Sequence, residues 1–432
     1  MEIPPAGKHS LLGRIKVPGD KSISHRALIF ASIASGNSKI KGLLEAEDCL
    51  HTLEIMQNLG VEIINSNSRE YRIKGVGMYG IREADKVLDC GNSGTTMRIL
   101  SGLLAAQNYY YVLSGDNSLR NRPMTRIKIP LQKMGAEIWS RKNGRAPLSI
   151  KGGKLNTIEY DLPVASAQVK SAILLAGLYT SGIVKIREPA LSRDHTEKML
   201  KMMGVDLKKE GKEIILNTKD LSKLNSFNIE IPADISSAAF ILAGGLIVKG
   251  SELLVKNVGI NYTRNGFLEI LKKMDADITL HNKVKSGSEP TADIKVKYSK
   301  LKGVNISGEI IPRLLDEIPI LAVLATQAEG KTVIRDAEEL RVKETDRLKA
   351  LSSELIKIGA DIKELKDGLI VKGPVELSGG RVKSHGDHRI AMALAIAGLV
   401  SNNGVEIENS EVVANSFPDF QEKLLKVLYN YN

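Results

Sequence analysis

Six stretches of the sequence place a polar or charged cluster directly before a run of small and apolar residues that is long enough for a buried helix. These runs begin, at intervals of 68, 74, 67, 80 and 72 residues, near Ala27, Thr95, Val169, Ser236, Asp316 and His388. Regular spacing on this scale indicates an internal repeat. Six copies of about 70 residues would account for the whole chain.

A second pattern recurs with the same period. A turn of the form hydrophobic-Gly-hydrophobic-acid-hydrophobic occurs around Gly60, Gly135, Gly204 and Gly359, and a degenerate copy surrounds Asp275. Gly after the last helical turn supplies a left-handed cap, and the alternating residues that follow predict a strand. Each repeat is therefore predicted as strand, helix, strand, helix, strand, which makes the fold class α/β.

Composition excludes several classes of protein. The chain is 43% hydrophobic and 26% charged, which suits a soluble enzyme of about two or three domains. Its apolar runs fall short of the roughly 18 residues of a membrane span, and the N-terminal MEIPPAGKHS lacks a signal or transit pattern. We expect a cytoplasmic protein without a membrane partner. Cys49 and Cys90 lack metal-ligand spacing, so we expect reduced thiols and no metal site.

A formal net charge of +11 requires an explanation. A Lys-rich solvated surface accounts for most of it. Nucleic acid is disfavoured because aromatic residues make up only 4% of the chain and include a single Trp, so no stacking platform is visible. Small acidic substrates are favoured, because the unusual basic residues stand at specific repeat positions.

The first polar cluster, VPGDKSISHR, ends at Arg26. Ser22 or Ser24 is predicted to cap the helix that follows, with Lys21 at its start. Ser22 and Arg26 are four residues apart, so both lie on one face near the positive end of the helix, which suits phosphate or carboxylate. The alternative is a capped helix with solvent-facing Lys and Arg.

The second cluster, LDCGNSGTTMR, ends at Arg98. Its two glycines leave bare backbone N–H groups that can contact an anion, although the spacing matches neither the Walker nor the dinucleotide pattern. Arg120 and Arg122 follow, just before Pro123, and one of the two is expected to be only a surface residue.

Two later clusters bring candidate chemistry. In RVKETDR, a helix beginning near Thr345 would project Lys343 and Arg347 together and place Glu344 between cations. The alternative is a surface salt-bridge network.

In SHGDHR, Asp387 is predicted to cap a helix while His388 and Arg389 face outward from its start. Asp316 opens another apolar run, where it could be only an N-cap.

Together these motifs resemble one family, the 3-phosphoshikimate 1-carboxyvinyltransferases. GDKSISHR, GNSGTTMR, NRPM, SAQVKSA, SRDHTE, RVKETDRL and GDHRIAMA occur in the family's order along essentially the whole chain. The resemblance implies a transferase of the shikimate pathway, which supplies chorismate for aromatic amino acid biosynthesis. It would transfer the enolpyruvyl group of phosphoenolpyruvate to the 5-hydroxyl of shikimate 3-phosphate and release phosphate, without a metal or cofactor.

The same resemblance implies the substrate contacts. Shikimate 3-phosphate would bind to Lys21, Ser22, Arg26, Ser166, Ala167, Gln168, Arg193, Asp316 and Lys343. Phosphoenolpyruvate would bind to Lys21, Gly94, Arg122, Gln168, Arg347 and Arg389. Several guanidinium groups and an ammonium are what a carboxylate and a phosphate require.

Asp316, Glu344 and Lys21 are the implied catalytic residues. Asp316 would accept the 5-hydroxyl proton, and Glu344 would protonate the methylene carbon. Lys21 would assist at the departing or the attacking oxygen. Positioned proton transfer contributes about 10²- to 10⁴-fold, so holding the two anions together must supply much of the remainder.

The chain departs from many members of the family near its C-terminus. Asn415 precedes the Phe-Pro-Asp turn where many members have Lys, and with His25, Arg193 and His195 this resembles the family's second sequence class. The group that assists the leaving phosphate is therefore open. Gly94 matches members inhibited by glyphosate, so sensitivity is a hypothesis.

The family fold implies two similar globular domains, each of three repeats arranged as an inside-out α/β barrel. A double hinge would join residues 1–19 plus 234–432 to residues 20–233, with domain closure over the substrates. We expect a monomer. The nearer alternative is a UDP-N-acetylglucosamine enolpyruvyl transferase, but its loop Cys is missing between Asp116 and Pro123. A basic RNA-processing relative is more distant.

Overall fold

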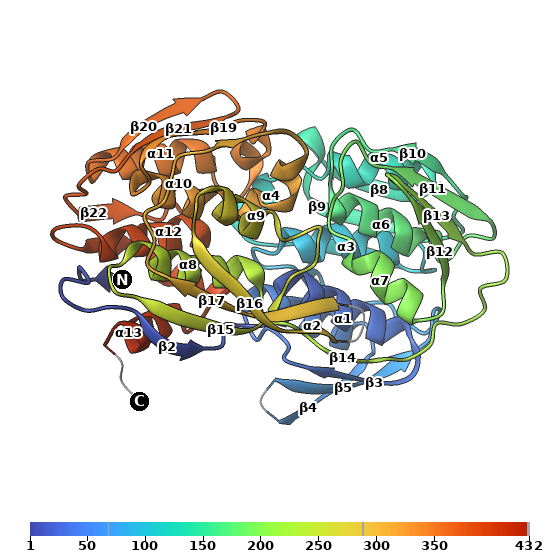
Figure 1. Ribbon diagram of the computed structural model, residues 1–432. Helices are drawn as coiled ribbons and strands as arrows, with labels where there is room; N and C mark the ends of the chain where they lie inside the picture. Colours follow the sequence, from blue (N-terminus) through green and yellow to red (C-terminus); the bar gives the residue numbers. More distant parts are fainter. Residues whose placement is uncertain (68, 287–288, 430–432) are drawn as a thin grey trace. The chain divides into compact units, whose positions relative to one another are not determined.

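The computed structural model describes residues 1–67, 69–286 and 289–429 (Figure 1). The described chain divides into two compact units. The first unit contains Met1–Pro18, Pro232–Lys285 and the described residues from Pro290 onward, and the second contains Gly19–Ile231 with Ser286 and Glu289. Sequence analysis did not anticipate the return of the chain to the second unit at Ser286 and Glu289.

Five of the six sheets in the described chain have four strands, one more than the predicted repeat, whereas the sheet that contains Glu2–Ile3 has the predicted three. The second repeat runs β6 (Leu88–Asp89), α3 (Gly94–Leu104), β7 (Tyr110–Ser114), the helices α4 (Asn117–Asn121) and α5 (Thr125–Lys133), β8 (Glu137–Arg141) and β9 (Arg145–Lys151). In the sheet the order is β6-β7-β9-β8, with β6 parallel to β7 and the other pairs antiparallel. The Gly turn therefore leads into a hairpin, of which the sequence pattern marked only the first strand.

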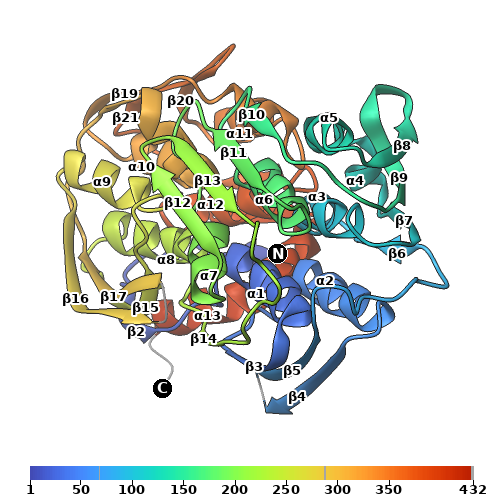
Figure 2. The same cartoon turned by 90° about the vertical axis from the view of Figure 1, so that its right-hand side faces the viewer.

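Two further sheets of the second unit repeat this order. One consists of β14 (Asn228–Glu230), β3 (Ser35–Lys41), β5 (Glu70–Val76) and β4 (Glu62–Asn67). The other consists of β10 (Glu159–Asp161), β11 (Ile183–Arg187), β13 (Glu213–Asn217) and β12 (Asp206–Glu210). Their helices are α1 (Lys21–Ile33), α2 (Glu47–Asn58), α6 (Ala167–Gly177) and α7 (His195–Met202). Figure 2 shows the green strands β11, β12 and β13 with α6 and α7.

The first unit contains the other three sheets of the described chain. Their strands are, in spatial order, β16 (Asp277–Ser286), β17 (Glu289–Lys297), β15 (Glu252–Gly259) and β2 (Leu12–Ile15); β18 (Asn305–Ile306), β19 (Gly330–Ile334), β21 (Gly368–Gly373) and β20 (Asp361–Leu365); and β1 (Glu2–Ile3), β23 (Val405–Glu408) and β22 (Gly380–Lys383). Their helices are α8 (Ile235–Ile247), α9 (Gly266–Lys273), α10 (Ile318–Thr326), α11 (Arg347–Lys357), α12 (His388–Leu399) and α13 (Phe420–Tyr429).

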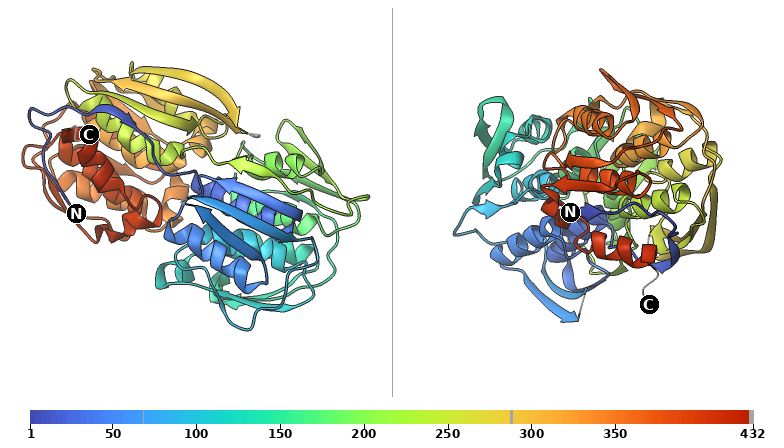
Figure 3. Two further views of the ribbon diagram at one scale, coloured as in Figure 1. Left: turned by 90° about the horizontal axis from the view of Figure 1, so that it is seen from below. Right: turned by 90° about the vertical axis from the view of Figure 1, so that its left-hand side faces the viewer.

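The six predicted apolar runs are the buried helices α1, α3 and α6 of the second unit and α8, α10 and α12 of the first. Within the second unit α3 packs on α6, and within the first α12 packs on α8 and α10. Each unit has its own hydrophobic core. The left view of Figure 3 shows the blue strands of the second unit lying across helices of that unit. Within the second unit α1 packs on β3 and β5, and within the first α8 packs on β15 and α10 on β21.

Helix ends follow the predicted chemistry with one correction. Gly60, Gly135, Gly204 and Gly359 have φ of 89°, 101°, 88° and 97°, and the degenerate Asp275 has φ of 60°. The left-handed caps are therefore confirmed.

The cap of α1 differs from the prediction. Asp20 caps α1 by accepting a hydrogen bond from the backbone N–H of Ile23, while Ser22 and Ser24 lie inside the helix. An Asp one residue before the helix accepts this bond without distorting the first turn.

Across the described residues, no helix combines the length and apolar character needed to cross a membrane.

Candidate active site

The first turn of α1 gathers polar side chains in the second unit. Lys21, its first residue, lies 2.6 Å from a carboxylate oxygen of Asp48 on α2. Ser22 accepts a 2.9 Å hydrogen bond from the guanidinium of Arg193, which precedes α7. Residues 171 positions apart in sequence thus meet at one helix start, where backbone N–H groups favour an anion.

Arg26 lies one turn further along the same helix and is only 1% exposed. Its Nη1 donates to the carbonyl of Ser22, and its Nη2 lies 3.5 Å from the carbonyl of Ala167 at the start of α6. Burial lowers the pKa of Arg26 to about 10, and the neighbouring Arg193 contributes to the shift. Arg26 remains a cation at neutral pH.

Gln168 connects α6 to a second group of predicted residues. Its carbonyl oxygen accepts a 2.7 Å hydrogen bond from Arg98, and its amide donates to the hydroxyl of Thr95 at 2.9 Å. Gly94 begins α3, and a Cβ built on it would lie 2.8 Å from Nη1 of Arg98 and 3.4 Å from Nη1 of Arg122. A methyl group at Gly94 would therefore crowd the guanidinium of Arg98, whereas Arg122 would lie at ordinary van der Waals distance from it.

The predicted residues around α6 and α3 are held by short polar contacts. Arg122 is buried and donates to the amide oxygen of Asn92 at 2.6 Å. Ser166 caps α6 by accepting a 3.4 Å hydrogen bond from the N–H of Val169. Arg120, by contrast, bonds Asn117 at the exposed side of α4, which agrees with the prediction that one of the two Arg residues lies at the surface.

In the first unit, Asp316 meets three guanidinium groups. It lies in the short 3₁₀ helix Leu315–Glu317 before α10 and is not the cap of that helix. One of its carboxylate oxygens is 3.2 Å from Arg347, and the other is 3.5 Å from Arg389 and 3.7 Å from Arg264. Asp316 therefore lies among side chains suited to binding an anion, and not at a helix end alone.

Arg347 joins the carboxylates of this cluster. Its Nη2 is 2.6 Å from Glu344, its Nε is 2.7 Å from Asp387, and its side chain is 2% exposed. Burial alone would lower the pKa of Arg347, but Asp387, Glu344 and Asp316 together raise it. The predicted helix starts at Arg347 with Asp346 as its cap, so the prediction of a start near Thr345 is corrected by two residues. These buried contacts exclude a network confined to the surface.

Asp387 caps α12 as predicted, by accepting hydrogen bonds from the N–H groups of Arg389 and Ile390. His388 and Arg389 were expected to face outward and are buried instead. Arg389 turns back to donate to the backbone carbonyl of Asp316 at 3.3 Å, because the carboxylate there offers a compensating charge. This compensation permits burial of the guanidinium.

Lys343 is partly exposed between η4 (Glu338–Val342) and α11. Burial lowers the pKa of Lys343, Asp316 opposes this shift, and Arg347 adds to it. The ammonium therefore loses its proton more readily than an ordinary Lys.

Sequence reasoning missed three residues at these clusters. Arg98, Asp48 and Arg264 were not proposed as site residues, although Arg98 closes one of the quoted motifs. Arg264 is 4% exposed, but in the sequence it stands between Thr263 and Asn265 and outside the charged motifs, so no signal in the sequence indicated that it would be buried.

One group of the described residues has ligand types for a metal ion. Ligand atoms of Asp194, His195 and Glu289 lie within 4.8 Å of one another. The ammonium of Lys198 lies 3.1 Å from Asp194 and 3.4 Å from Glu289, so a cation already stands between these carboxylates. We assign no metal to this group.

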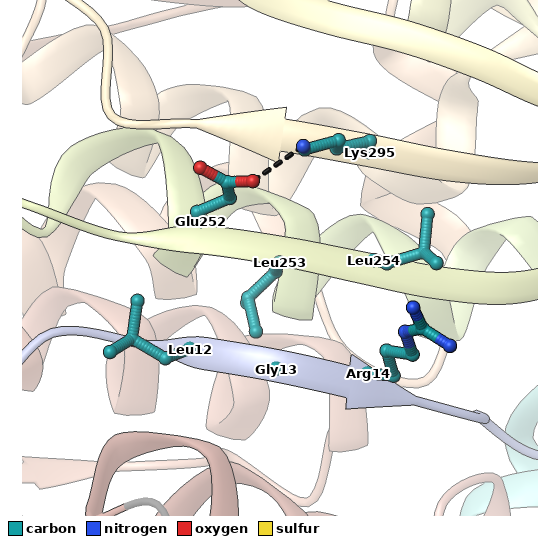
Figure 4. A pocket seen from close by; sticks show the side chains of 7 residues that line it. All are labelled: Leu12, Gly13, Arg14, Glu252, Leu253, Leu254 and Lys295. Atoms are coloured by element: carbon teal, nitrogen blue, oxygen red, sulfur yellow. Dashed lines mark ion pairs between the residues drawn. The ribbon is translucent and has the colours of Figure 1, made fainter.

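A hollow of about 390 Å³ lies away from these charged groups, on the sheet of β2, β15 and β17 (Figure 4). Leu12, Leu254 and the ion-paired Glu252 and Lys295 line it. With a single Arg beside this neutralised pair, the hollow lacks the cation clusters that an acidic substrate requires.

Comparison with known proteins first defines the class. The solved structure of the enolpyruvyl transferase NikO from Streptomyces tendae superposes with a TM-score of 0.79 over 99% of this chain and 96% of that one, at 17% identity. At that identity the likeness establishes the fold alone, which is mixed α/β.

Closer relatives define the family. The family described as EPSP synthase (3-phosphoshikimate 1-carboxyvinyltransferase) matches residues 5–424. The 3-phosphoshikimate 1-carboxyvinyltransferase of Thermodesulfovibrio yellowstonii is 53% identical over 417 residues, covering 96% of this chain and 97% of the relative. The structure of EPSP synthase from Acinetobacter baumannii is 45% identical with a TM-score of 0.88, covering 99% of this chain and 97% of that one. The chain belongs to the EPSP synthase family and is a transferase.

Proposed function

We propose that the protein transfers the enolpyruvyl group of phosphoenolpyruvate to the 5-hydroxyl of shikimate 3-phosphate, in the shikimate pathway to aromatic amino acids. Family membership supports the reaction, and the cluster around Arg347 supports it chemically. One guanidinium holds the carboxylates of Glu344 at 2.6 Å and Asp316 at 3.2 Å. Two carboxylates that can transfer protons thus lie beside one cation that can bind phosphate or carboxylate. This observation carries the proposal.

Shikimate 3-phosphate is assigned to the start of α1 and α6, with two further contacts from the first unit. The hydroxyl of Ser22, the guanidinium groups of Arg26 and Arg193 and the first turn of α6 supply donors for its acidic groups. The assigned residues are Lys21, Ser22, Arg26, Ser166, Ala167, Gln168, Arg193, Asp316 and Lys343.

Phosphoenolpyruvate is assigned to the guanidinium groups that converge near Gly94 and those around Asp316. Nη1 of Arg122 would lie 3.4 Å from a Cβ built on Gly94, so a guanidinium donor lies near the backbone N–H groups at the start of α3. The assigned residues are Lys21, Gly94, Arg122, Gln168, Arg347 and Arg389.

The reaction proceeds by addition and elimination. The 5-hydroxyl oxygen bonds to C2 of phosphoenolpyruvate while Asp316 accepts the hydroxyl proton and Glu344 delivers a proton to C3. The resulting tetrahedral intermediate still carries phosphate. Glu344 then removes a proton from C3, the double bond reforms and phosphate leaves, with Lys21 assisting at the oxygen. Glu344 thereby regains the proton that it gave to C3, and Asp316 passes the hydroxyl proton to the departing phosphate, so the protons balance over the cycle.

The two units are proposed to act as domains, each an inside-out barrel of three repeats, joined by a double hinge. The substrate assignments draw on residues of both units, so closure on the substrates would complete the site and exclude water. The open protein would then be catalytically incomplete. We propose that it acts as a monomer.

Phosphate release tests the proposal. The parent is expected to release phosphate from phosphoenolpyruvate with shikimate 3-phosphate and not with UDP-N-acetylglucosamine. Glu344→Gln should lower kcat by about 10²-fold or more. Glu338→Gln is the matched control, because this exposed residue lies on η4 and undergoes the same change of charge. Release with the nucleotide sugar, or equal activity of Glu344→Gln and the parent, would overturn the substrate or the catalytic assignment respectively.

A further inference from the structure

Helices α6 and α7 are joined by two adjacent polar contacts. The ammonium of Lys170 on α6 lies 2.6 Å from a carboxylate oxygen of Glu197 on α7. The next residue of α6, Ser171, shares a 2.7 Å hydrogen bond with Thr196, the residue before Glu197. An ion pair and a hydroxyl pair therefore fix the register of the two helices side by side.

The hydroxyl pair is where Arg26 is held. Its Nε donates to Thr196 and its Nη2 to Ser171, both at 2.8 Å. The guanidinium plane of Arg26 is thus fixed by one acceptor from each helix, so a shift of α7 against α6 would break one of the two bonds. Arg193 lies two residues before the start of α7 and depends on the same placement.

The ion pair between Lys170 and Glu197 is buried, so it constrains where the two side chains can lie. Lys170 is 0% exposed and also lies 3.0 Å from Glu188, which accepts a hydrogen bond from Ser192. Two carboxylates surround one ammonium, which leaves one negative charge close to Arg26. Glu197 opposes the effect of burial and of Arg193 on the pKa of Arg26. The excess carboxylate therefore offsets repulsion between the two guanidinium groups.

We propose that Lys170 and Glu197 are positioning residues for substrate binding, which act through Thr196 and Ser171 to hold Arg26 and Arg193 where shikimate 3-phosphate binds. This inference rests on the assignment of Arg26 to that substrate. Neither Lys170 nor Glu197 touches the ligand. Their loss therefore weakens the binding of shikimate 3-phosphate and leaves phosphoenolpyruvate binding unaffected.

Glu197→Gln is the principal variant. Lys170 keeps Glu188 as an ion-pair partner, so the substitution leaves no uncompensated buried cation. The Kd of shikimate 3-phosphate, measured by calorimetry without phosphoenolpyruvate, is expected to rise by about 10- to 100-fold, the effect of a displaced charged hydrogen bond. The KM for phosphoenolpyruvate at saturating shikimate 3-phosphate should stay within about twofold. Glu188→Gln, the same change on the other partner of Lys170, should leave the Kd within about twofold.

A second pair of variants tests the hydroxyl contact independently of charge. Thr196→Val should raise the same Kd by about tenfold, and Thr196→Ser, which keeps the acceptor for Arg26, should restore it. Thr180→Val is the control, because Thr180 is also buried in the second unit and shares a hydrogen bond with Thr218. Thermal melts establish that each variant is folded. If Glu197→Gln does not fold, the comparison of Thr196→Val with Thr196→Ser tests the positioning role by itself.

The outcomes separate this inference from the proposed function. Absence of shikimate 3-phosphate binding by the parent overturns the proposed function. With binding by the parent and its loss in Arg26→Met, the assignment of Arg26 stands. The positioning role is then overturned by an unchanged Kd in Glu197→Gln and Thr196→Val, by an equal rise in the Glu188 or Thr180 controls, or by an equal rise in the KM for phosphoenolpyruvate.

Discussion

Replacement of Arg347 by Met should destabilise the first unit strongly. The guanidinium is 2% exposed and contacts Glu344 at 2.6 Å, Asp387 at 2.7 Å and Asp316 at 3.2 Å. Met fills part of the volume and leaves three carboxylates without their shared cation. Removal of one partner from a buried ion pair costs about 3–5 kcal/mol, so the free energy of unfolding of this unit should fall by about that amount.

Urea denaturation with two probes can assign the loss to one unit. Trp139, the single Trp of the sequence, lies on β8 of the second unit, so its fluorescence follows that unit, whereas far-ultraviolet circular dichroism follows both. Arg347→Met should move the circular dichroism transition to lower urea and leave the fluorescence transition in place. Arg341→Met is the control, because Arg341 forms partly exposed ion pairs with Asp346 and Glu364, both at 2.8 Å. Loss of such pairs costs about 0–1 kcal/mol.

The pH dependence gives a further check. The pKa of Arg347 is raised in the folded protein, so its contribution to stability is fully present below the unfolded pKa and is lost only as pH rises through the folded pKa. The deficit of Arg347→Met should therefore persist at neutral pH. A deficit no larger than that of Arg341→Met, or one that is absent at neutral pH, would refute the reasoning.

Two other substitutions test particular contacts. Gly94→Ala should raise the KM for phosphoenolpyruvate by about tenfold, because the new methyl group would lie 2.8 Å and 3.4 Å from two guanidinium nitrogens, whereas Gly153→Ala, with open space around it, should match the parent in steady-state kinetics. Glu354→Gln should lower the melting temperature at neutral pH. Burial alone would raise the pKa of Glu354, but hydrogen bonds from Lys357 and His385 lower it, so its contribution is present above the ordinary Glu pKa of about 4.3 and disappears as pH falls through the folded value. Melts across this range that show a constant difference would contradict that account.

Local pattern was enough to predict the repeat and much of its chemistry. The turns at Gly60 and Gly135 and the cap at Asp387 depend only on residues within a few positions, so the sequence contains their full cause. The burial of six apolar helices likewise follows from their composition. The sequence pattern did not predict the second strand of the hairpins, because that strand also pairs with another strand of the sheet.

Long-range contacts account for the remaining differences. Arg26 and Thr196 meet across 170 residues of sequence, and Arg264 reaches Asp316 from outside any motif. His388 and Arg389 were expected at the surface, but the fold supplies Arg389 with compensating contacts at Asp316. A charged residue is buried only where tertiary structure provides its partner, and the local sequence does not specify that partner.

The short return of the chain at Ser286 and Glu289 has a consequence for dissecting this protein into fragments. His195 is buried in the second unit with its Nδ1 2.7 Å from Glu289, yet these residues are 94 positions apart and Glu289 lies beyond Ile231, where the main segment of that unit ends. A gene encoding only Gly19–Ile231 would omit the carboxylate that contacts both the buried imidazole of His195 and the ammonium of Lys198. A split-protein or circularly permuted version would therefore need a graft of this short piece, and an isolated fragment without it is expected to express poorly.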